Sequence, residues 1–126
     1  MPSYALSPLF EPQYVPNAVG AAVFATGGNP TAVPTGVAYQ ITVARVANIG
    51  QAPVNLTVWR VPQGAGADNQ HIVVPQIAIP PASASFPWME LSALWGSILQ
   101  AGDSIWTLAN AQNALVLQGD GVIISL

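Results

Sequence analysis

The sequence predicts an all-β protein: an antiparallel β-sandwich of about eight strands, preceded by an extended, proline-rich N-terminal arm. Several short runs alternate apolar and polar residues with a period of two, which is the pattern of strands with one buried face. Turn-forming residues separate these runs at the spacing typical of sandwiches and barrels. The 126 residues are enough for one domain with a single core between two packed layers.

Residues 1–18 predict the arm, because prolines stand at positions 2, 8, 12 and 16. Proline fixes φ and drives the preceding residue into extended geometry, so a helix is excluded here. A disordered tail is the alternative, but such tails are poor in aromatic and large aliphatic residues. We therefore expect an arm that lies on a surface, either that of its own domain (residues 19–126) or that of a neighbour. Its candidate contact residues are Tyr4, Leu6, Leu9, Phe10 and Tyr14.

The strands of the domain are predicted by alternation and by their many β-branched residues. The alternation is clearest at Tyr39, Ile41 and Val43, which we expect to face inward together. The predicted strands are Val19–Thr26, Val37–Asn48, Val54–Val61, His71–Ile79, Ser85–Leu91, Asp103–Ala109, Asn113–Gln118 and Val122–Leu126.

Turn chemistry predicts the connections. Residues 48–51, Asn-Ile-Gly-Gln, predict a hairpin between the second and third strands, and Gly119-Asp120-Gly121 is the strongest local hairpin signal. The segment Leu91–Leu99 is an exception, because its apolar residues fit a helical period. We expect one or two helical turns there, or a buried irregular loop, since Gly96 weakens a helix.

The charge content is unusually low. Charged residues make up 6% of the chain and lysine is absent, whereas an ordinary soluble domain has about 25% charged residues. A small neutral protein kept soluble by Gln, Asn, Ser and Thr is one explanation. The other is that partner subunits cover much of the surface, because the cores of interfaces are depleted in charge. With only Arg45 and Arg60 as cations, we expect no nucleic-acid partner.

Several classes of site lack the residues that they need. The absence of cysteine excludes disulfides, thiolate metal sites and cysteine nucleophiles. No unbroken run of about 18 apolar residues indicates a membrane span, and the N-terminus lacks the basic and apolar regions of a signal peptide.

Acid–base chemistry and metal binding are also unsupported. The single histidine, His71, is expected in a surface loop, since no nucleophile motif accompanies it. Asp68, Asp103 and Asp120 stand beside turn glycines or loop residues, where aspartate commonly caps turns. We therefore expect no catalytic residue, no cofactor and no metal site.

The four tryptophans are the remaining candidates for a binding role. They are Trp59, Trp88, Trp95 and Trp106. Exposed tryptophans form platforms for sugar rings or anchor protein interfaces, and we expect at least two of the four to pack in the core. Trp88 and Trp95 are the candidate interface anchors.

A succession of short motifs resembles small phage virion proteins. These motifs are Val46-Ala47-Asn48-Ile49-Gly50, then Ile79-Pro80-Pro81, then Leu99-Gln100-Ala101-Gly102-Asp103-Ser104-Ile105, and a final stretch from Leu117 to Ile124. Over residues 37–126 the chain resembles head-decoration or tail-accessory proteins with a jelly-roll-like sandwich. The resemblance implies a jelly-roll-like fold and a role in assembly without chemistry.

Together these observations lead us to expect a capsid decoration, or cement, protein on the surface of a virion. Its partners would be the major capsid protein or other virion subunits, and it would form a dimer or trimer. Residues 1–18 would staple across a subunit boundary, since several points of attachment add their affinities. A tail, collar or fibre-attachment protein is the alternative within the same particle, and a carbohydrate-binding module is the alternative from another class.

Overall fold

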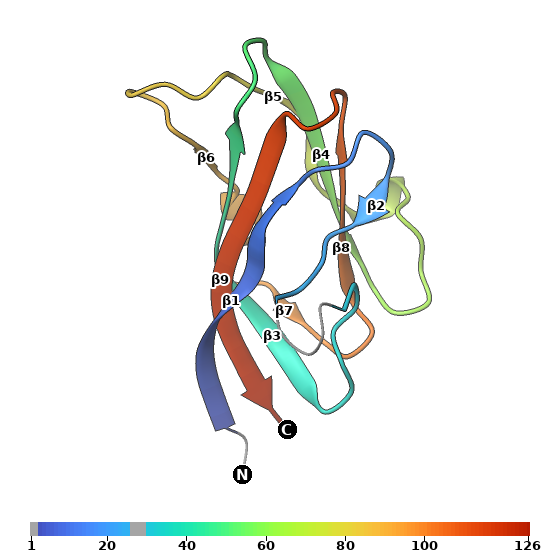
Figure 1. Ribbon diagram of the computed structural model, residues 1–126. Coiled ribbons are helices and arrows are strands. Elements are labelled where there is room, and N and C mark those ends of the chain that lie inside the picture. The colour runs from blue at the N-terminus through green and yellow to red at the C-terminus, as the bar shows by residue number, and fades with distance from the viewer. Residues whose placement is uncertain (1–2, 26–29) are drawn as a thin grey trace.

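The computed structural model describes residues 3–25 and 30–126 and consists of two antiparallel sheets packed face to face (Figure 1). The fold is therefore an all-β antiparallel sandwich, as predicted. Two short 3-10 turns, η1 (Asn69–His71) and η2 (Ser92–Leu94), are the helical elements of the described residues. The five-stranded sheet contains β1 (Ser3–Tyr14), β3 (Val37–Asn48), β6 (Met89–Glu90), β7 (Ile98–Leu99) and β9 (Leu115–Ser125), and the four-stranded sheet contains β2 (Gly20–Ala21), β4 (Val54–Val61), β5 (Ile72–Ile79) and β8 (Ser104–Ala109).

The strand order is that of a jelly roll. The five-stranded sheet has the order β1-β9-β3-β6, with β7 also paired to β3, and the four-stranded sheet has the order β2-β8-β4-β5. In the first sheet β1 lies beside β9 and β3 beside β6, and in the second sheet β2 lies beside β8 and β4 beside β5. The chain therefore wraps around the sandwich as jelly rolls do. Because β6 and β7 share one side of β3, the nine strands found in residues 3–25 and 30–126 fill eight positions, in agreement with the predicted number of about eight.

An aromatic row lies in the core between the sheets. The ring of Phe24 stacks on Phe10 at a centroid distance of 5.2 Å and meets the edge of Tyr39 at 5.0 Å. All three side chains are almost completely buried. Aromatic pairs of this geometry contribute about 0.5–1.5 kcal/mol beyond their buried area. The row ties the N-terminal strand to β3, so β1 is part of the core.

This burial corrects the separation of an N-terminal arm from the domain. Residues 3–14 are extended, but they form an edge strand that pairs with β9, so residues 18 and 19 do not mark a structural boundary. Leu9 and Phe10, expected as contacts to another subunit, are 0% and 2% exposed. Two register shifts in β1, between Pro8 and Phe10 and between Phe10 and Gln13, interrupt the alternation and let both residues face the core.

The hairpin expected at Gly119-Asp120-Gly121 is also wrong, because these residues lie in the middle of the continuous strand β9. The glycines are required by close backbone contact. A Cβ on Gly121 would lie 2.1 Å from the Gln40 carbonyl oxygen, and one on Gly119 would lie 2.7 Å from that of Val43. Glycine inside a strand commonly marks such an approach.

A matching irregularity occurs in β3 on the other side of β9. The register shifts between Ile41 and Val43, and the hydroxyl of the extra residue, Thr42, donates to the Asp120 carbonyl oxygen at 3.1 Å. A bulge reverses which residues face the core. Tyr39 and Ile41 are therefore buried as expected, whereas Val43 lies on the outer face beside Asp120.

The connection after β3 crosses between the sheets and is not the expected hairpin, since β3 and β4 belong to different sheets. Asn48 holds this corner with a side chain that is 1% exposed. Its amide nitrogen donates to the carbonyl oxygens of Ala52 and Ile79 at 2.8 and 2.9 Å, and its oxygen accepts from the Gly50 amide at 2.9 Å.

Other boundaries follow the sequence to differing degrees. The ranges of β3 and β4 match the predicted strands at both ends. The strand expected at 19–26 is reduced to β2, with Thr26 outside the described residues, and the strand expected at 85–91 is reduced to β6. The helical signal of residues 91–99 becomes η2 followed by β7.

We predict that Gly121→Ala lowers the free energy of unfolding by about 2–3 kcal/mol, because its methyl group would force β3 and β9 apart. Urea denaturation followed by tryptophan fluorescence measures this change. Gly66→Ala is the matched control, since a Cβ there meets nothing within 4 Å. Equal stability of the two variants would contradict the crowding argument.

We also predict that Asn48→Ala lowers the free energy of unfolding by about 2–3 kcal/mol, because it leaves the buried Ile79 carbonyl without its donor. The control is Asn17→Ala, whose side chain is exposed, and which should change stability by less than about 0.5 kcal/mol. Thermal denaturation compares the two, and a small effect of both would refute the proposed role of Asn48.

Candidate functional site

The outer face of the five-stranded sheet carries three of the seven candidate interface residues, Tyr4, Leu6 and Tyr14. Leu115 and Leu117 of β9 lie in the core, so the alternate residues of that strand point outward. Registers with β1 and β3 then identify their outward neighbours. This outer face contains Tyr4, Leu6, Pro8 and Tyr14 from β1; Gln40, Val43 and Arg45 from β3; Val116, Gln118, Asp120, Val122 and Ile124 from β9; and Glu90 and Ile98 from β6 and β7.

Large apolar side chains are unusually exposed here. Leu6 is 87% exposed and Tyr4 71%, which are high values for residues inside a strand. Their register partners on β9 are Val122 and Ile124, which are only partly covered. Ile98 adds a further exposed aliphatic side chain from β7. Scattered apolar residues are common on surfaces, but a contiguous apolar patch marks an interaction site.

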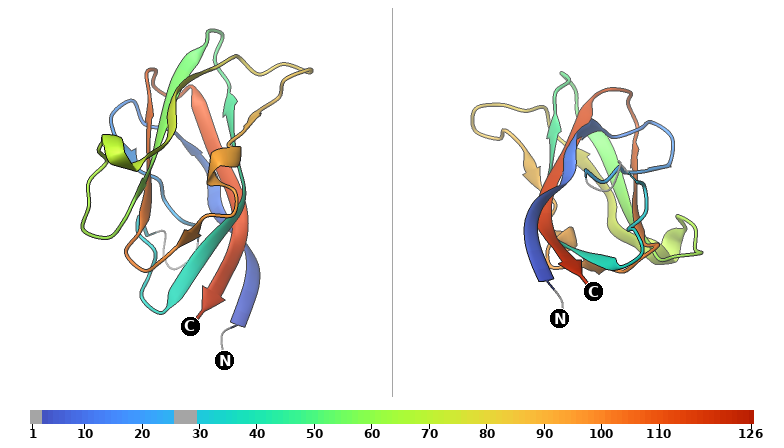
Figure 2. Two further views of the ribbon diagram at one scale, coloured as in Figure 1. Left: turned by 180° about the vertical axis from the view of Figure 1, so that it is seen from behind. Right: turned by 60° about the horizontal axis from the view of Figure 1, so that its bottom comes forward.

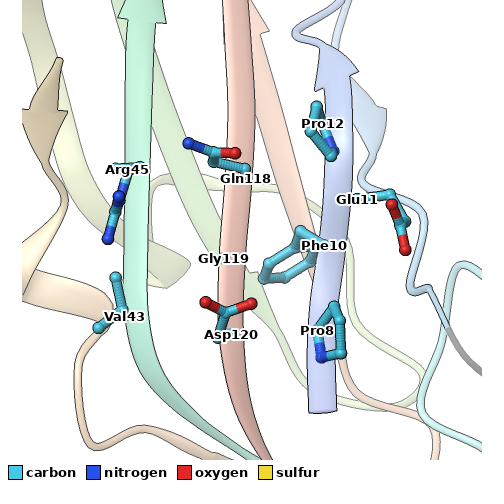
Figure 3. Close-up of a pocket in the computed structure, with 9 residues that line it drawn as sticks. All are labelled: Pro8, Phe10, Glu11, Pro12, Val43, Arg45, Gln118, Gly119 and Asp120. Carbon is cyan, nitrogen blue, oxygen red and sulfur yellow. The ribbon is translucent and has the colours of Figure 1, made fainter. Parts of the chain in front are cut away.

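Two shallow hollows lie along the middle of this face, at the bulges of β1 and β3. The first has a volume of about 150 Å³ and the second about 360 Å³, and both are bordered by Pro8 and Asp120. Figure 3 shows the first hollow, with Arg45 on β3, Gln118 and Asp120 on β9, and prolines on β1. The bulges that relieve crowding inside the sheet thus also shape its outer surface.

Five of the seven charged residues of the chain lie on or beside this face: Glu11, Arg45, Arg60, Glu90 and Asp120. The Arg45 guanidinium lies over the Trp88 ring, 5.0 Å from its centroid. The Trp88 indole N–H donates to the Glu90 carboxylate at 2.7 Å. Arg45 and Glu90 are register partners on neighbouring strands, so the cation, the ring and the carboxylate form one cluster.

Five of the seven predicted interface residues are exposed in the structure. Tyr4, Leu6 and Tyr14 are exposed on the outer face, and Trp88 is exposed beside Arg45. Trp95 lies at the edge of the sheet, where its indole N–H donates to the Ala44 carbonyl at 3.3 Å. Leu9 and Phe10 leave this set because they are buried in the core.

Sequence reasoning missed the contribution of β9 and β7 to this face, namely Ile98, Val122 and Ile124. If Gly119-Asp120-Gly121 is interpreted as a turn, Val122 begins a new strand, and the sequence then does not indicate which face of the sheet its side chain joins. A continuous strand through the glycines would have placed Val122 and Ile124 on the same face as Gln118. The signal was therefore present in the alternation, but the hairpin interpretation removed it.

The other tryptophans do not form an exposed platform. Trp59 is 7% exposed, and its indole nitrogen is buried with no hydrogen-bond partner. Trp106 is half-buried and donates to the Ser104 hydroxyl at 2.9 Å. Of the two exposed tryptophans, Trp88 has Arg45 over its ring, which occupies a face that a sugar ring would need.

His71, Asp68 and Asp103 lie away from this face and form local hydrogen bonds. His71 lies in η1, where its Nδ1 is 2.6 Å from an Asp68 carboxylate oxygen. The Asp103 carboxylate accepts the backbone amides of Gln63 and Gln100, so the predicted turn-capping role is confirmed for this residue. Within residues 3–25 and 30–126, no group of three His, Asp or Glu side chains is placed to hold a metal ion.

We predict a favourable coupling of about 0.5–1 kcal/mol between Arg45 and Trp88, because the ring attracts the cation at a partly exposed site. A double-mutant cycle with Arg45→Met and Trp88→Leu, measured by urea denaturation, gives this value. The control cycle pairs Trp88→Leu with Arg60→Met, since Arg60 binds the Ile98 carbonyl oxygen instead. Equal coupling in both cycles would reject the contact.

Comparison of the chain with protein-family models, curated proteins and solved structures finds no significant match. Among the described residues, no helix is long and apolar enough to cross a membrane. The functional argument therefore depends on the fold and the surface. Jelly rolls occur in viral capsid proteins and in lectins, and a fold alone does not decide between such roles.

Proposed function

We propose that this protein is a non-enzymatic structural subunit of a virion, a capsid decoration or cement protein that binds the major capsid protein and stabilises the shell by packing. The observation that carries the proposal is the exposed apolar outer face of the five-stranded sheet, with Tyr4 and Leu6 at its most exposed end. The resemblance of residues 37–126 to small phage virion proteins is the reason for proposing a virion as the assembly to which this face binds.

The composition of this face matches that of a protein interface. Aromatic residues and arginine are enriched in interfaces, and lysine is depleted. Here Tyr4, Tyr14 and Trp88 are exposed, Arg45 lies over a tryptophan ring, and the chain contains no lysine. Such anchors contribute most of the binding energy in known interfaces. A face of this kind supports permanent contact with other subunits.

Charge on the face indicates the character of the partner. Glu11, Glu90 and Asp120 lie on or near it together with Arg45, and the second cation, Arg60, lies at its edge, where it donates to the Ile98 carbonyl oxygen. The local excess of negative charge favours a partner surface that is neutral or basic, because like charges across an interface are costly. The hollows beside Asp120 would receive apolar or basic side chains of the shell.

Stabilisation by such a subunit needs a stiff body and repeated contacts. The two hydrogen-bonded sheets and the buried aromatic row provide the stiff body. Weak contacts made simultaneously by many copies add up to firm attachment, because each contact raises the effective concentration of the next. No chemical step is required for this function.

The proposal predicts that the protein is a stoichiometric component of purified virus particles. Particles prepared by density-gradient sedimentation from cells carrying the native gene should contain the protein in a copy number comparable to that of the major capsid protein. Particles without the gene product should assemble but open at a lower temperature, because they lack the added packing. Quantitative mass spectrometry and a thermal genome-release assay measure the two effects.

A variant set locates the contact. Ile98→Lys, which places a charge on the outer face, should reduce binding to depleted particles, whereas Ile49→Lys, at an exposed position in the corner after β3, should bind normally. A copy number of only a few per particle would replace the capsid role by a tail, collar or fibre-attachment role. Absence from particles together with retention on immobilised polysaccharide would favour a carbohydrate-binding module.

A further inference from the structure

We infer that the N-terminal half of β1, Ser3–Ser7, pairs edge to edge with the same segment of a second copy of this chain, in antiparallel orientation about a two-fold axis. The inference begins with the free edge of β1. Its role in assembly rests on the proposed function, but the contact itself is a property of the isolated protein.

The hydrogen-bonding directions of β9 identify which backbone groups are free. β9 lies between β1 and β3, so its residues bond alternately to one side and to the other. Leu115 accepts the Val15 amide on the β1 side, whereas Ala114 and Leu126 bond to Ile49 and Gly36 on the β3 side. Odd residues of β9 therefore bond to β1 and even residues to β3.

This alternation leaves Tyr4 and Leu6 with their backbone groups directed away from β9. Ser3, Ala5 and Ser7 oppose Ser125, Ile123 and Gly121, which bond to β1. Tyr4 and Leu6 oppose the even residues Ile124 and Val122. The N–H and C=O groups of Tyr4 and Leu6 thus form an open row at the edge of the sheet. No described residue outside β9 hydrogen-bonds to the backbone of residues 3–7.

The remainder of the same edge is protected. The Leu9 carbonyl accepts the Ala25 amide at 2.8 Å, and the Gln13 side chain bonds to both backbone groups of Val23 at 2.9 Å. Proline and charge at Pro8, Glu11 and Pro12 further discourage strand addition. Residues 3–7 contain no proline and no charge, so the protection stops where the open row begins.

The positions of the prolines select one register. When Tyr4 faces Leu6 of the second copy, both chains exchange N–H···O=C bonds and all four free groups on each side are paired. Leu6 opposite Leu6 would place Tyr4 opposite Pro8, which has no N–H to donate. Tyr4 opposite Tyr4 would leave Leu6 without a partner among the described residues of the second copy, so each of these registers loses bonds. The two-fold axis then passes through Ala5, whose small side chain suits the close approach of a non-hydrogen-bonded pair.

A second copy is the occupant that this edge fits best. Identical antiparallel strands are self-complementary, as a two-fold contact requires. The absence of charge in residues 3–7 means that two copies meet without repulsion. On the outer face, each Tyr4 would lie beside a Leu6 of the second copy, and aromatic–aliphatic pairs across strands are favourable. The figures place this half of β1 at the margin of the molecule, open to approach (Figures 1 and 2).

The dimer would join two five-stranded sheets into one continuous sheet and double the apolar outer face. Five paired residues span about 17 Å, which is shorter than the strands that usually make stable interfaces. We therefore expect a dimer that forms at high protein concentration and is reinforced when both copies bind a common surface.

Analytical ultracentrifugation of the full chain over a wide concentration range tests the contact. The wild type should shift from monomer to dimer. Leu6→Pro should raise the dissociation constant at least roughly tenfold, because it removes a donor in each copy, yet it should remain folded, since this N–H does not bond to β9. Leu6→Ala is the control that removes the same side chain and keeps the N–H; its dimer should be weakened less.

Residue-resolved hydrogen exchange gives a second readout that does not depend on a variant. The amides of Tyr4 and Leu6 should become protected as the concentration rises, whereas those of Ala5 and Ser7, which face β9, should be protected at every concentration. A monomer at all concentrations, a trimer, or a dimer in which Tyr4 and Leu6 exchange freely would each overturn the inference. None of these results bears on whether the protein is found in particles, which tests the proposed function separately.

Discussion

The close approach of three strands at Gly119 and Gly121 is the constraint on which the rest of this jelly roll depends. β9 is hydrogen-bonded on both sides, to β1 and to β3, and carbonyl oxygens of β3 lie where side chains of the two glycines would be. Both neighbouring strands bulge at this point. The bulge in β1 turns Leu9 and Phe10 together into the core, and the bulge in β3 turns Val43 outward. The crowded pairing at Gly119 and Gly121 thus coincides with the points where β1 and β3 change which side chains face the core.

Odd residues of β9 bond to β1, so the alternate residues of β1 direct their backbone groups toward the outer edge. The two halves of this edge differ in how well those groups are covered. Toward its C-terminal end, the edge is covered by the segment around Val23 and Ala25 and is marked by prolines. Toward its N-terminal end, Tyr4 and Leu6 present both apolar side chains and free backbone groups. Proteins usually protect such edges, and this one is protected over only half its length, which is the basis of the inferred strand pairing.

The outer face and the open edge give the proposed assembly role a physical argument that the fold alone does not provide. A jelly roll is compatible with capsid and with lectin functions, but exposed aromatic and aliphatic residues, the Arg45–Trp88–Glu90 cluster and the scarcity of charge are features of surfaces that contact protein. Of the four tryptophans, Trp59 is buried, Trp106 is half-buried and Trp88 is covered on one side by Arg45, which leaves Trp95 as an isolated exposed ring rather than part of a platform. These features therefore favour the proposed packing between subunits over sugar recognition.

The sequence by itself determined the fold class and the bounds of β3 and β4, because alternation with a period of two records directly which side chains meet the core. It also identified Tyr4, Leu6, Tyr14, Trp88 and Trp95 as candidate interface residues, and all five are exposed. The burial of Leu9 and Phe10, the continuity of β9 through Gly119-Asp120-Gly121 and the sheet-crossing corner at Asn48 were decided only by tertiary structure. Glycine in a turn and glycine under a neighbouring backbone look identical in sequence, because the reason for the second lies in a strand that is some 80 residues away along the chain.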